Sequence, residues 1–231
     1  MIQIDVLTLF PGFFESPLSA SILKIAIEKG LLEIRLHDLR TWGVGKRRNV
    51  DDRPYGGGPG MLMTPGPIFE AVEALGGTKD GRLILLTPQG KRLDQELLDE
   101  LAKEDRLVLI CGRYEGIDER VRIGLSPEEI SIGDYVLSGG EIPSLVLIEG
   151  LARQIPGVLG DDRSADAESF KGGVLDFPQY TRPPEFRGMR VPEVLLGGDH
   201  KKIDEWRRQE GLRRTLAVRP DLRSGGTDGY R

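Results

Sequence analysis

The first 160 residues alternate between short apolar runs and segments in which apolar residues recur every three or four positions. The continuous runs predict strands over 2–9, 32–36, 83–87 and 107–111. The helical spacing predicts helices over 65–75, 95–103 and 142–154, together with a first helix that begins at Ser16 and ends at Gly30.

Residues typical of helix ends support these boundaries. Ser16 and Pro17 suit the cap and the first position of the first helix, and Thr64 precedes the second helix. Strands that alternate with helices predict an α/β domain with a mostly parallel sheet. Because ligand sites of such sheets lie at the carboxyl ends of the strands, the loops after Leu86 and Ile110 are the first places to search.

The pattern changes after residue 156. Small and acidic residues without apolar periodicity occupy 157–173, which is typical of a linker. A small, mainly helical unit follows, and its clearest helix runs from 200 to about 210 with Asp199 as its cap. A unit of about 55 residues has a marginal core, so we expect it to pack on a larger domain or a second subunit. The predicted division is a domain over 1–160, a linker over 161–175 and a helical domain over 176–231.

Composition excludes several classes of protein. The 231-residue chain has one cysteine and two histidines, so it holds neither a disulfide framework nor a Cys/His cluster for zinc. No apolar run approaches the roughly 18 residues that a membrane-spanning helix needs, and no secretory signal is recognised, so we expect a cytoplasmic protein. The sequence also lacks the P-loop, Rossmann, hydrolase-elbow and zinc-protease motifs.

The net charge of −5 argues mildly against a nucleic-acid partner, but this charge is unevenly distributed. Residues 1–160 hold 18 Lys and Arg against 24 Asp and Glu, whereas residues 161–231 hold 14 against 13. Basic residues cluster between Lys201 and Arg219, and a triplet occupies 46–48. Such clusters are suited to phosphate contact, although a solvated helix face with ion pairs gives the same pattern.

Glycine-rich segments mark the expected ligand edge of the sheet. Residues 87–90 and 111–116 follow predicted strands, and 132–141 precedes a predicted helix. Together they would bring backbone N–H and C=O groups close to a flat heterocycle such as adenine, while each alone also fits a tight turn. A further segment, 51–61, joins charged residues to four glycines in five positions, which indicates either a functional loop or a flexible connection.

These segments resemble the signature motifs of the bacterial tRNA (guanine-N1)-methyltransferases, a family of the SPOUT superfamily. The resemblance rests on DDRPYGGGPGM at 51–61, PQG at 88–90, CGRYEGIDER at 111–120 and IGDYVLSGGE at 132–141. It continues through IPGVLG at 155–160 and YTRP at 180–183, so it covers nearly the whole chain. The resemblance implies a homodimer with a SPOUT-type parallel sheet, a trefoil knot at the C-terminal end of that sheet, and a small helical C-terminal domain.

The resemblance also implies a reaction, which is methyl transfer from S-adenosylmethionine to N1 of guanosine 37, immediately 3′ of the anticodon of tRNA. It assigns these residues to the cofactor: Leu86, Thr87, Pro88, Gln89, Gly90, Gly112, Arg113, Tyr114, Glu115, Ile132, Gly133, Asp134, Tyr135, Val136, Leu137, Gly139, Gly140 and Pro143. We expect these residues to contact the anticodon stem-loop: Lys46, Arg47, Arg48, Asp51, Arg53, Tyr55, Gly58, Lys201, Arg207, Arg208 and Arg214.

The chemistry requires a base and a cation, because guanine N1 loses a proton while negative charge passes to O6. By resemblance, Arg153 supplies the cation and Glu168 in the linker is the base. The family commonly has aspartate at this position, and the extra methylene of glutamate moves the carboxylate by about a bond length. Either the linker backbone compensates for this displacement, or Asp161, Asp162 or Asp166 shares the role of Glu168. A linker that carries the base would act as a lid that tRNA completes.

Two alternatives remain at this point. The chain could methylate another RNA, or it could be a dimeric RNA-binding protein without catalysis. A Mg²⁺ requirement is suggested by the family alone, since the sequence shows no cluster of metal ligands.

Overall fold

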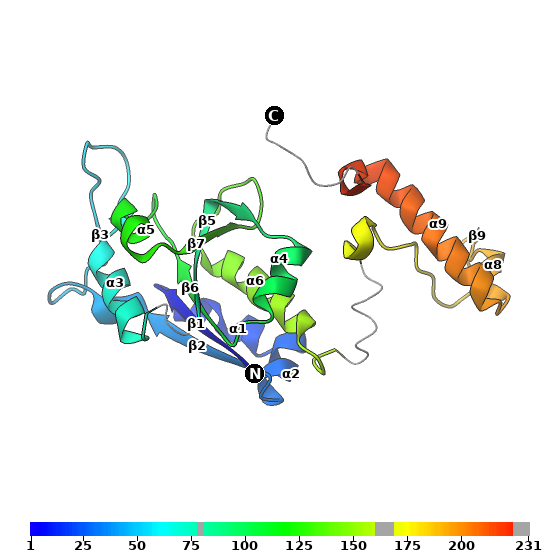
Figure 1. Ribbon diagram of the computed structural model, residues 1–231, viewed down its shortest axis with the longest axis horizontal. Coiled ribbons are helices and arrows are strands. Elements are labelled where there is room, and N and C mark those ends of the chain that lie inside the picture. Colours follow the sequence, from blue (N-terminus) through cyan, green and yellow to red (C-terminus); the bar gives the residue numbers. More distant parts are fainter. Residues whose placement is uncertain (78–80, 160–168, 224–231) are drawn as a thin grey trace. The chain divides into compact units, whose positions relative to one another are not determined.

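The computed structural model describes residues 1–77, 81–159 and 169–223, and the chain divides into two compact units, 1–160 and 161–231 (Figure 1). The first unit is built on five parallel strands in the order β2-β1-β6-β5-β7. These strands are β1 (Ile2–Thr8), β2 (Leu32–Asp38), β5 (Arg82–Arg92), β6 (Arg106–Cys111) and β7 (Glu128–Ser131). The predicted α/β domain with a parallel sheet is therefore confirmed.

Helices cover both faces of this sheet (Figure 1). One face packs against α2 (Ser21–Glu28), α4 (Gln95–Leu101) and α6 (Glu141–Gln154), and the other against α3 (Pro65–Ala74) and α5 (Glu119–Leu125). The continuous apolar run in β6 packs on both faces of the sheet. Leu107 and Leu109 pack in the core beneath α2, α4 and α6, whereas Val108 and Ile110 pack in the core beneath α3 and α5.

The first predicted helix is wrong in its extent. The chain forms η1 (Pro11–Phe13), α1 (Glu15–Leu18) and then α2, so Ser16 and Pro17 lie inside α1. The Ser19 hydroxyl donates to the Ser16 carbonyl at 2.8 Å, and Ala20 is extended, which separates the two helices. The short elements η2 (Leu39–Trp42), β3 (Asp51–Asp52) and β4 (Leu62–Met63) follow β2.

Three further differences concern the ligand edge of the sheet. The strand predicted over 83–87 continues to Arg92, with a shift in its pairing to β7 between Leu86 and Lys91. The sequence pattern missed α5, which Asp118 caps through a bond from the Arg120 N–H, and it missed β7. In β7 the one large buried apolar side chain is Ile130, so no apolar run marks this edge strand.

The second unit is organised along one long helix. It contains η3 (Lys171–Gly173), β8 (Glu185–Phe186), β9 (Met189–Arg190), α8 (Glu193–Leu196), α9 (His200–Val218) and η4 (Pro220–Arg223). Asp199 caps α9 as predicted, but the helix continues past Gly211 to Val218. A Cβ at Gly211 would lie 2.9 Å from the Leu175 carbonyl oxygen, so this glycine allows the preceding segment to approach the helix.

The predicted linker over 157–173 begins too early, because Val158 packs in the core of the first unit. Its central residues, 160–168, lie outside the described residues. Within the described part of the chain, no helix is long and apolar enough to cross a membrane.

Candidate active site

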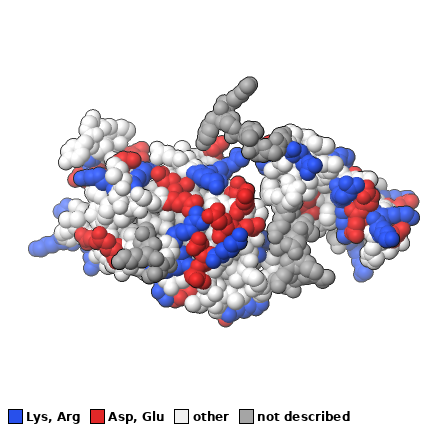
Figure 2. All heavy atoms as spheres, viewed as in Figure 1, with Lys and Arg blue, Asp and Glu red and all other residues white. Residues whose placement is uncertain are grey.

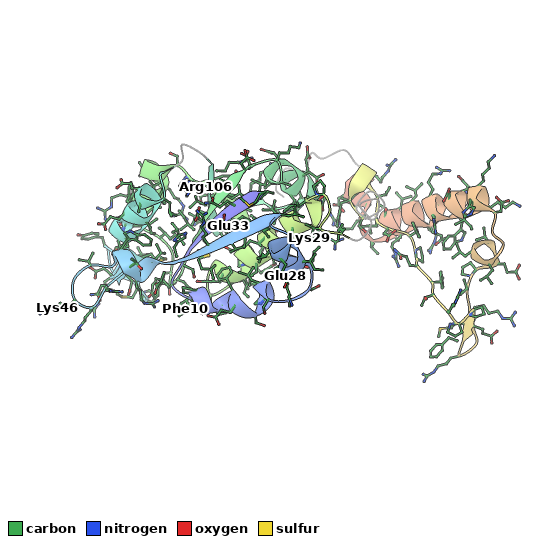
Figure 3. The ribbon with its side chains drawn as sticks, turned by 90° about the horizontal axis from the view of Figure 1, so that it is seen from below. Phe10, Glu28, Lys29, Glu33, Lys46 and Arg106 are labelled. Carbon is green, nitrogen blue, oxygen red and sulfur yellow. The ribbon has the colours of Figure 1, made fainter. Side chains whose placement is uncertain are left out.

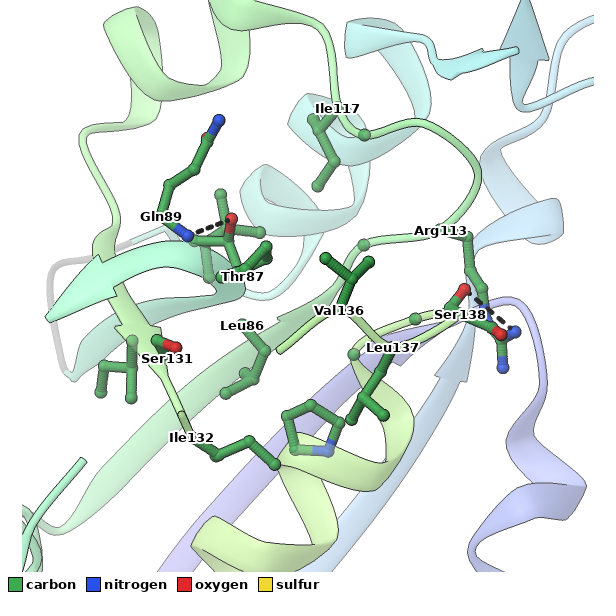
Figure 4. Close-up of a pocket in the computed structure, with 18 of the residues that line it drawn as sticks. Leu86, Thr87, Gln89, Arg113, Ile117, Ser131, Ile132, Val136, Leu137 and Ser138 are labelled. Atoms are coloured by element: carbon green, nitrogen blue, oxygen red, sulfur yellow. Dashed lines mark hydrogen bonds between the residues drawn. The ribbon is translucent and has the colours of Figure 1, made fainter. Parts of the chain in front are cut away.

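A cavity of about 330 Å³ lies at the carboxyl ends of the central strands, where the sheet topology predicts a ligand site. Most of its wall is formed by residues 85–89 of β5, 112–117 after β6, and 130–133 and 135–140 at and after the end of β7. The side chains of Leu86, Ile132 and Leu137 converge on one part of it (Figure 4). The volume falls within the range of small-molecule sites.

Most residues assigned to the cofactor line this cavity. They are Leu86, Thr87, Pro88, Gln89, Gly112, Arg113, Tyr114, Glu115, Ile132, Gly133, Tyr135, Val136, Leu137, Gly139, Gly140 and Pro143. Gly90 and Asp134 do not line it. A Cβ at Gly90 would lie 2.4 Å from the backbone of Glu129 and Ile130, so Gly90 allows the loop to pass close to β7.

The loops after β6 and β7 lie directly against each other. The Gly140 N–H donates to the Gly112 carbonyl at 2.9 Å, and a Cβ at Gly140 would lie 2.7 Å from the Cys111 Cα. Arg113 and Gly139 form an isolated antiparallel bridge. Gly140 is therefore required by close backbone approach rather than by flexibility.

A buried carboxylate connects the end of β1, the loop after β6 and the start of α6. Glu141, at the start of α6, is 1% exposed, and its Oε1 accepts from the Thr8 hydroxyl at 2.8 Å while its Oε2 accepts from the Arg113 Nε at 2.9 Å. Arg113 also donates to the Ser138 carbonyl at 3.3 Å. An acidic group at a helix N-terminus is electrostatically favourable. Sequence reasoning missed Glu141 as a site residue.

The Arg113 guanidinium also contacts the loop after β1. It lies 4.5 Å from the ring centroid of Phe10 and 5.7 Å from that of Phe13, and Arg40 lies 5.4 Å from the Phe10 ring. Phe10 and Phe13 are nonetheless 43% and 47% exposed. Two exposed aromatic rings thus lie beside Arg113 in the cavity wall.

The segment over 51–63 is joined to the cavity wall by backbone bonds. The Glu115 N–H donates to the Met61 carbonyl at 3.0 Å, and the Met63 N–H donates to the Gly116 carbonyl at 2.9 Å. The loop tip lies farther out, where the Tyr55 side chain is fully exposed and Gly58 has a φ of +124°. The predicted substrate loop is therefore anchored at its base to the predicted cofactor loop.

Tyr114 links the same two segments through its side chain. It is a non-glycine residue with a φ of +61°, and it lines the cavity. Burial raises the pKa of the Tyr114 phenol, and the neighbouring Asp51 carboxylate raises it further. The phenol therefore stays protonated and can act as a hydrogen-bond donor.

Arg122 on α5 lines the cavity, and sequence reasoning did not assign it to the site. Its guanidinium donates to Glu129 of β7 at 2.9 Å and to the Gln89 side-chain oxygen at 2.9 Å. It also pairs with Glu119 at 3.2 Å. The Gln89 side chain extends away from the apolar part of the cavity (Figure 4). No local sequence signal could show that α5 and the loop after Leu86 meet.

Cys111 does not serve as a nucleophile. Its thiol is fully buried and lies 3.1 Å from the Ser144 hydroxyl, and burial raises its pKa. The ordinary pKa of a thiol already leaves it mostly protonated at neutral pH, so this cysteine is a core residue.

The two residues assigned to catalysis are not seen together at this cavity. Arg153 lies near the end of α6, about 15 Å along the helix axis from Pro143, which lines the cavity. Glu168 and its alternatives Asp161, Asp162 and Asp166 lie outside the described residues. Within one chain, therefore, Arg153 does not contribute to the cavity wall.

The basic residues assigned to tRNA occur in both units. Lys46, Arg47 and Arg48 are exposed on a turn closed by the Val44–Asn49 bridge, and Lys46 extends away from the sheet (Figure 3). On α9, Arg207 pairs with Asp204 and Arg208 with Glu205, Arg214 donates to the Asp176 carbonyl at 3.4 Å, and Lys201 is exposed. Acidic and basic side chains are interleaved over the face seen in Figure 2.

The chain is similar to known proteins over nearly its whole length. The family model described as tRNA (Guanine-1)-methyltransferase TrmD matches residues 2–225. A tRNA (guanine-N(1)-)-methyltransferase of Geobacillus kaustophilus is 56% identical over 221 residues, which is 95% of this chain and 91% of the relative. Proteins with the same name from Dehalococcoides mccartyi and Geobacter sp. strain M21 are 54% and 51% identical, cover 95% and 96% of this chain, and are each matched over 90% of their own length. The chain therefore belongs to the tRNA (guanine-1)-methyltransferase family.

Proposed function

We propose that this protein transfers the methyl group of S-adenosylmethionine to N1 of guanosine 37 in tRNA, immediately 3′ of the anticodon. The family match over nearly the whole chain supports the reaction. The observation that carries it in the structure is the cavity at the carboxyl ends of the strands, whose wall is built from the segments that resemble the family's cofactor loops.

The cavity fits a cofactor that has a flat heterocycle. Its wall combines apolar side chains such as Leu86 and Leu137 with glycines at which a Cβ would collide with neighbouring atoms, such as Gly133 and Gly140. When bound there, S-adenosylmethionine supplies an electrophilic methyl group. The chain contributes a preorganised wall, which the buried Glu141–Arg113 pair holds in place.

Proton transfer and charge stabilisation are assigned to two side chains. The carboxylate of Glu168 takes the proton from guanine N1, and the Arg153 guanidinium stabilises the negative charge that passes to O6. Asp161, Asp162 and Asp166 are the alternative bases. Glu168→Gln and Arg153→Ala should each retain cofactor binding in calorimetry and lose turnover. Full activity of Glu168→Gln would transfer the role of base to one of these aspartates.

A homodimer accounts for the position of Arg153. Because Arg153 lies at the far end of α6 from the cavity of its own chain, a complete site needs a second copy. The apolar side chains of Ile142 and Val146 on α6 are each 45% exposed, and the exposed rings of Phe10 and Phe13 lie beside Arg113, which bonds to the first residue of this helix. Apolar side chains exposed on one helix support an interface along α6.

The finer features of the fold belong to the same proposal. The close passage of residues 139–140 beside 111–113 supports a trefoil knot at this end of the sheet. The linker over 161–175 acts as the lid, and the unit over 176–231 binds the anticodon stem-loop together with the triplet at 46–48. The protein works in the cytoplasm. The described residues contain no group of three side chains able to hold a metal ion, so we assign no site to Mg²⁺.

The decisive test is methyl transfer from labelled S-adenosylmethionine to two tRNA transcripts that differ at position 37. We expect label on the transcript with guanosine and none on the transcript with adenosine. Absence of label on the guanosine transcript, with cofactor binding intact, would favour a non-catalytic RNA-binding protein or a different RNA substrate. Mapping of the product by nuclease digestion identifies the methylated position.

A further inference from the structure

A two-stranded hairpin projects from the second unit. Glu185 pairs with Arg190 and Phe186 with Met189 in β8 and β9, and the turn consists of Arg187 and Gly188, which have φ values of +53° and +79°. Positive φ at both central residues is typical of a type I′ turn, whose twist matches that of the flanking strands. The hairpin stands clear of α9 (Figure 3).

The hairpin exposes apolar side chains. The directly paired residues Phe186 and Met189 are 57% and 65% exposed. Neither belongs to a hydrophobic core of the described residues. Residues that pair directly across a hairpin lie on the same face of it, so the two side chains form one apolar surface beside the turn.

The same hairpin carries an excess of positive charge. Its segment over 182–190 contains three arginines and one glutamate, and Glu185 is paired with Arg190 at 2.8 Å. Among the described residues, neither Arg182 nor Arg187 has a carboxylate within ion-pair distance. The Arg187 guanidinium lies instead 5.3 Å from the ring centroid of Phe186.

The arginines of α9 are placed differently. Arg208 pairs with Glu205 at 2.7 Å, Arg213 pairs with Glu210 at 2.6 Å, and both pairs lie within one helical turn. These cations are balanced by their own helix. The unbalanced guanidinium groups of the hairpin are therefore better suited to contact phosphates than the paired arginines of α9 are.

A chain of contacts connects the hairpin to the helix. The ring of Tyr180, just before the hairpin, lies 6.4 Å from that of Trp206, and the Arg207 guanidinium lies 4.9 Å from the Phe177 ring. The Leu175 N–H donates to the Thr215 hydroxyl at 2.8 Å. The segment that leads into the hairpin is thus held along α9, which gives the hairpin a fixed base.

We propose that the β8–β9 hairpin is a contact surface for tRNA, in which Arg182 and Arg187 bind backbone phosphates and Phe186 stacks on an unpaired nucleotide. An aromatic ring beside an unbalanced guanidinium is the combination that binds unstacked bases and their phosphates. The excess of positive charge favours a polyanionic partner over a second copy of this acidic chain. The proposal rests on the proposed function, because it takes tRNA as the substrate.

The test uses the full-length protein and a tRNA transcript with guanosine at position 37. We expect Arg187→Ala and Phe186→Ala each to raise KM for tRNA about tenfold, with KM for S-adenosylmethionine and kcat unchanged. The matched control is Arg213→Ala, which removes a paired, exposed arginine of α9 and should leave KM for tRNA within twofold of the original value. Phe186→Tyr should restore tight binding, since stacking needs only the ring.

Filter binding of tRNA over a range of KCl concentrations separates the two roles. Loss of one phosphate contact in Arg187→Ala should reduce the slope of log affinity against log salt by about 0.7 to 0.9, whereas Phe186→Ala should weaken binding and leave that slope unchanged. This measurement does not depend on turnover, so a failure to methylate guanosine and a failure of the hairpin to bind can be distinguished.

Two results would overturn the proposal. The first is that both hairpin variants bind tRNA with the affinity and the salt slope of the wild-type protein, while their thermal unfolding is also unchanged. The other is a change in sedimentation behaviour of these variants at unchanged tRNA affinity, which would make the hairpin a contact between copies of the chain.

Discussion

At the scale of single residues, the clearest requirement is the absence of a side chain at Gly140. The Cβ of an alanine would lie 2.7 Å from the Cys111 Cα, which is backbone and cannot rotate away. Gly140→Ala should therefore separate the loops after β6 and β7 and abolish the proposed binding of S-adenosylmethionine in calorimetry.

The matched control for this substitution is Gly66→Ala on α3. A Cβ at Gly66 meets no atom within 4 Å, so this variant should bind the cofactor normally. Normal binding by Gly140→Ala would show that the loops after β6 and β7 can move apart without loss of the site.

Asp5 is a buried carboxylate in the middle of β1 that no local pattern marks. Burial alone would raise its pKa, but hydrogen bonds from His37, Gln3 and Arg106 outweigh burial and lower the pKa below its ordinary value. The Arg106 Nε donates to Asp5 at 3.0 Å, and Arg106 also donates to the Leu75 carbonyl at 2.8 Å. The charged form of Asp5 thus connects three strands.

This lowered pKa predicts a pH dependence of stability. A carboxyl group whose folded pKa lies below its unfolded value of about 3.9 stabilises the fold fully above that value, and its contribution is lost as pH falls through the folded pKa. Asp5→Asn should lower the free energy of unfolding at pH 7 by about 2 kcal/mol. The difference from the original protein should shrink below pH 4 in urea titrations; a constant difference from pH 7 to pH 2 would contradict this assignment.

At the scale of elements, Arg122 connects α5 to β5 and to β7. Its bonds to Gln89 and Glu129 hold the irregular part of β5 against β7. We expect Arg122→Ala to weaken binding of S-adenosylmethionine about tenfold, with a smaller change in kcat, because the loop over 87–90 loses its fixed position.

Arg120→Ala is the control for Arg122→Ala. Arg120 lies on the same helix, is 67% exposed and pairs with Asp118. Its loss should leave cofactor affinity within twofold of the original value. Equal effects of the two substitutions would mean that α5 acts through its general stability rather than through the contact with Gln89.

At the scale of the whole molecule, the proposed dimer determines whether the site is complete. Val146→Glu places a charge on the half-exposed face of α6 and should produce monomers in sedimentation experiments, with turnover reduced at least a hundredfold. Ile123→Glu on α5 is the control, because Ile123 is 73% exposed on the opposite face of the sheet and should leave both properties unchanged. A fully active Val146→Glu monomer would exclude a shared site.

The sequence by itself determined the parallel sheet, most of the cavity wall and the family. Buried strands appear as apolar runs, and the glycine-rich loops that follow them keep a recognisable order, so local patterns were sufficient for these features. The predicted end of the last helix at about residue 210 shows the limit of such patterns, because the continuation of α9 past Gly211 goes with the approach of Leu175, a residue far away in sequence.

Only the tertiary structure decided which side chains support the wall. Glu141, Thr8 and Arg113 come from three segments, and their shared buried network arises because parallel strands end at one edge of the sheet. The tertiary structure also decided which arginines have a carboxylate partner. Sequence counts place basic residues on α9, whereas the structure shows the ion pairs that balance several of them and the arginines of the hairpin that no described carboxylate neutralises. A charge becomes available to a partner only where folding leaves it without a counterion, and composition does not contain that information.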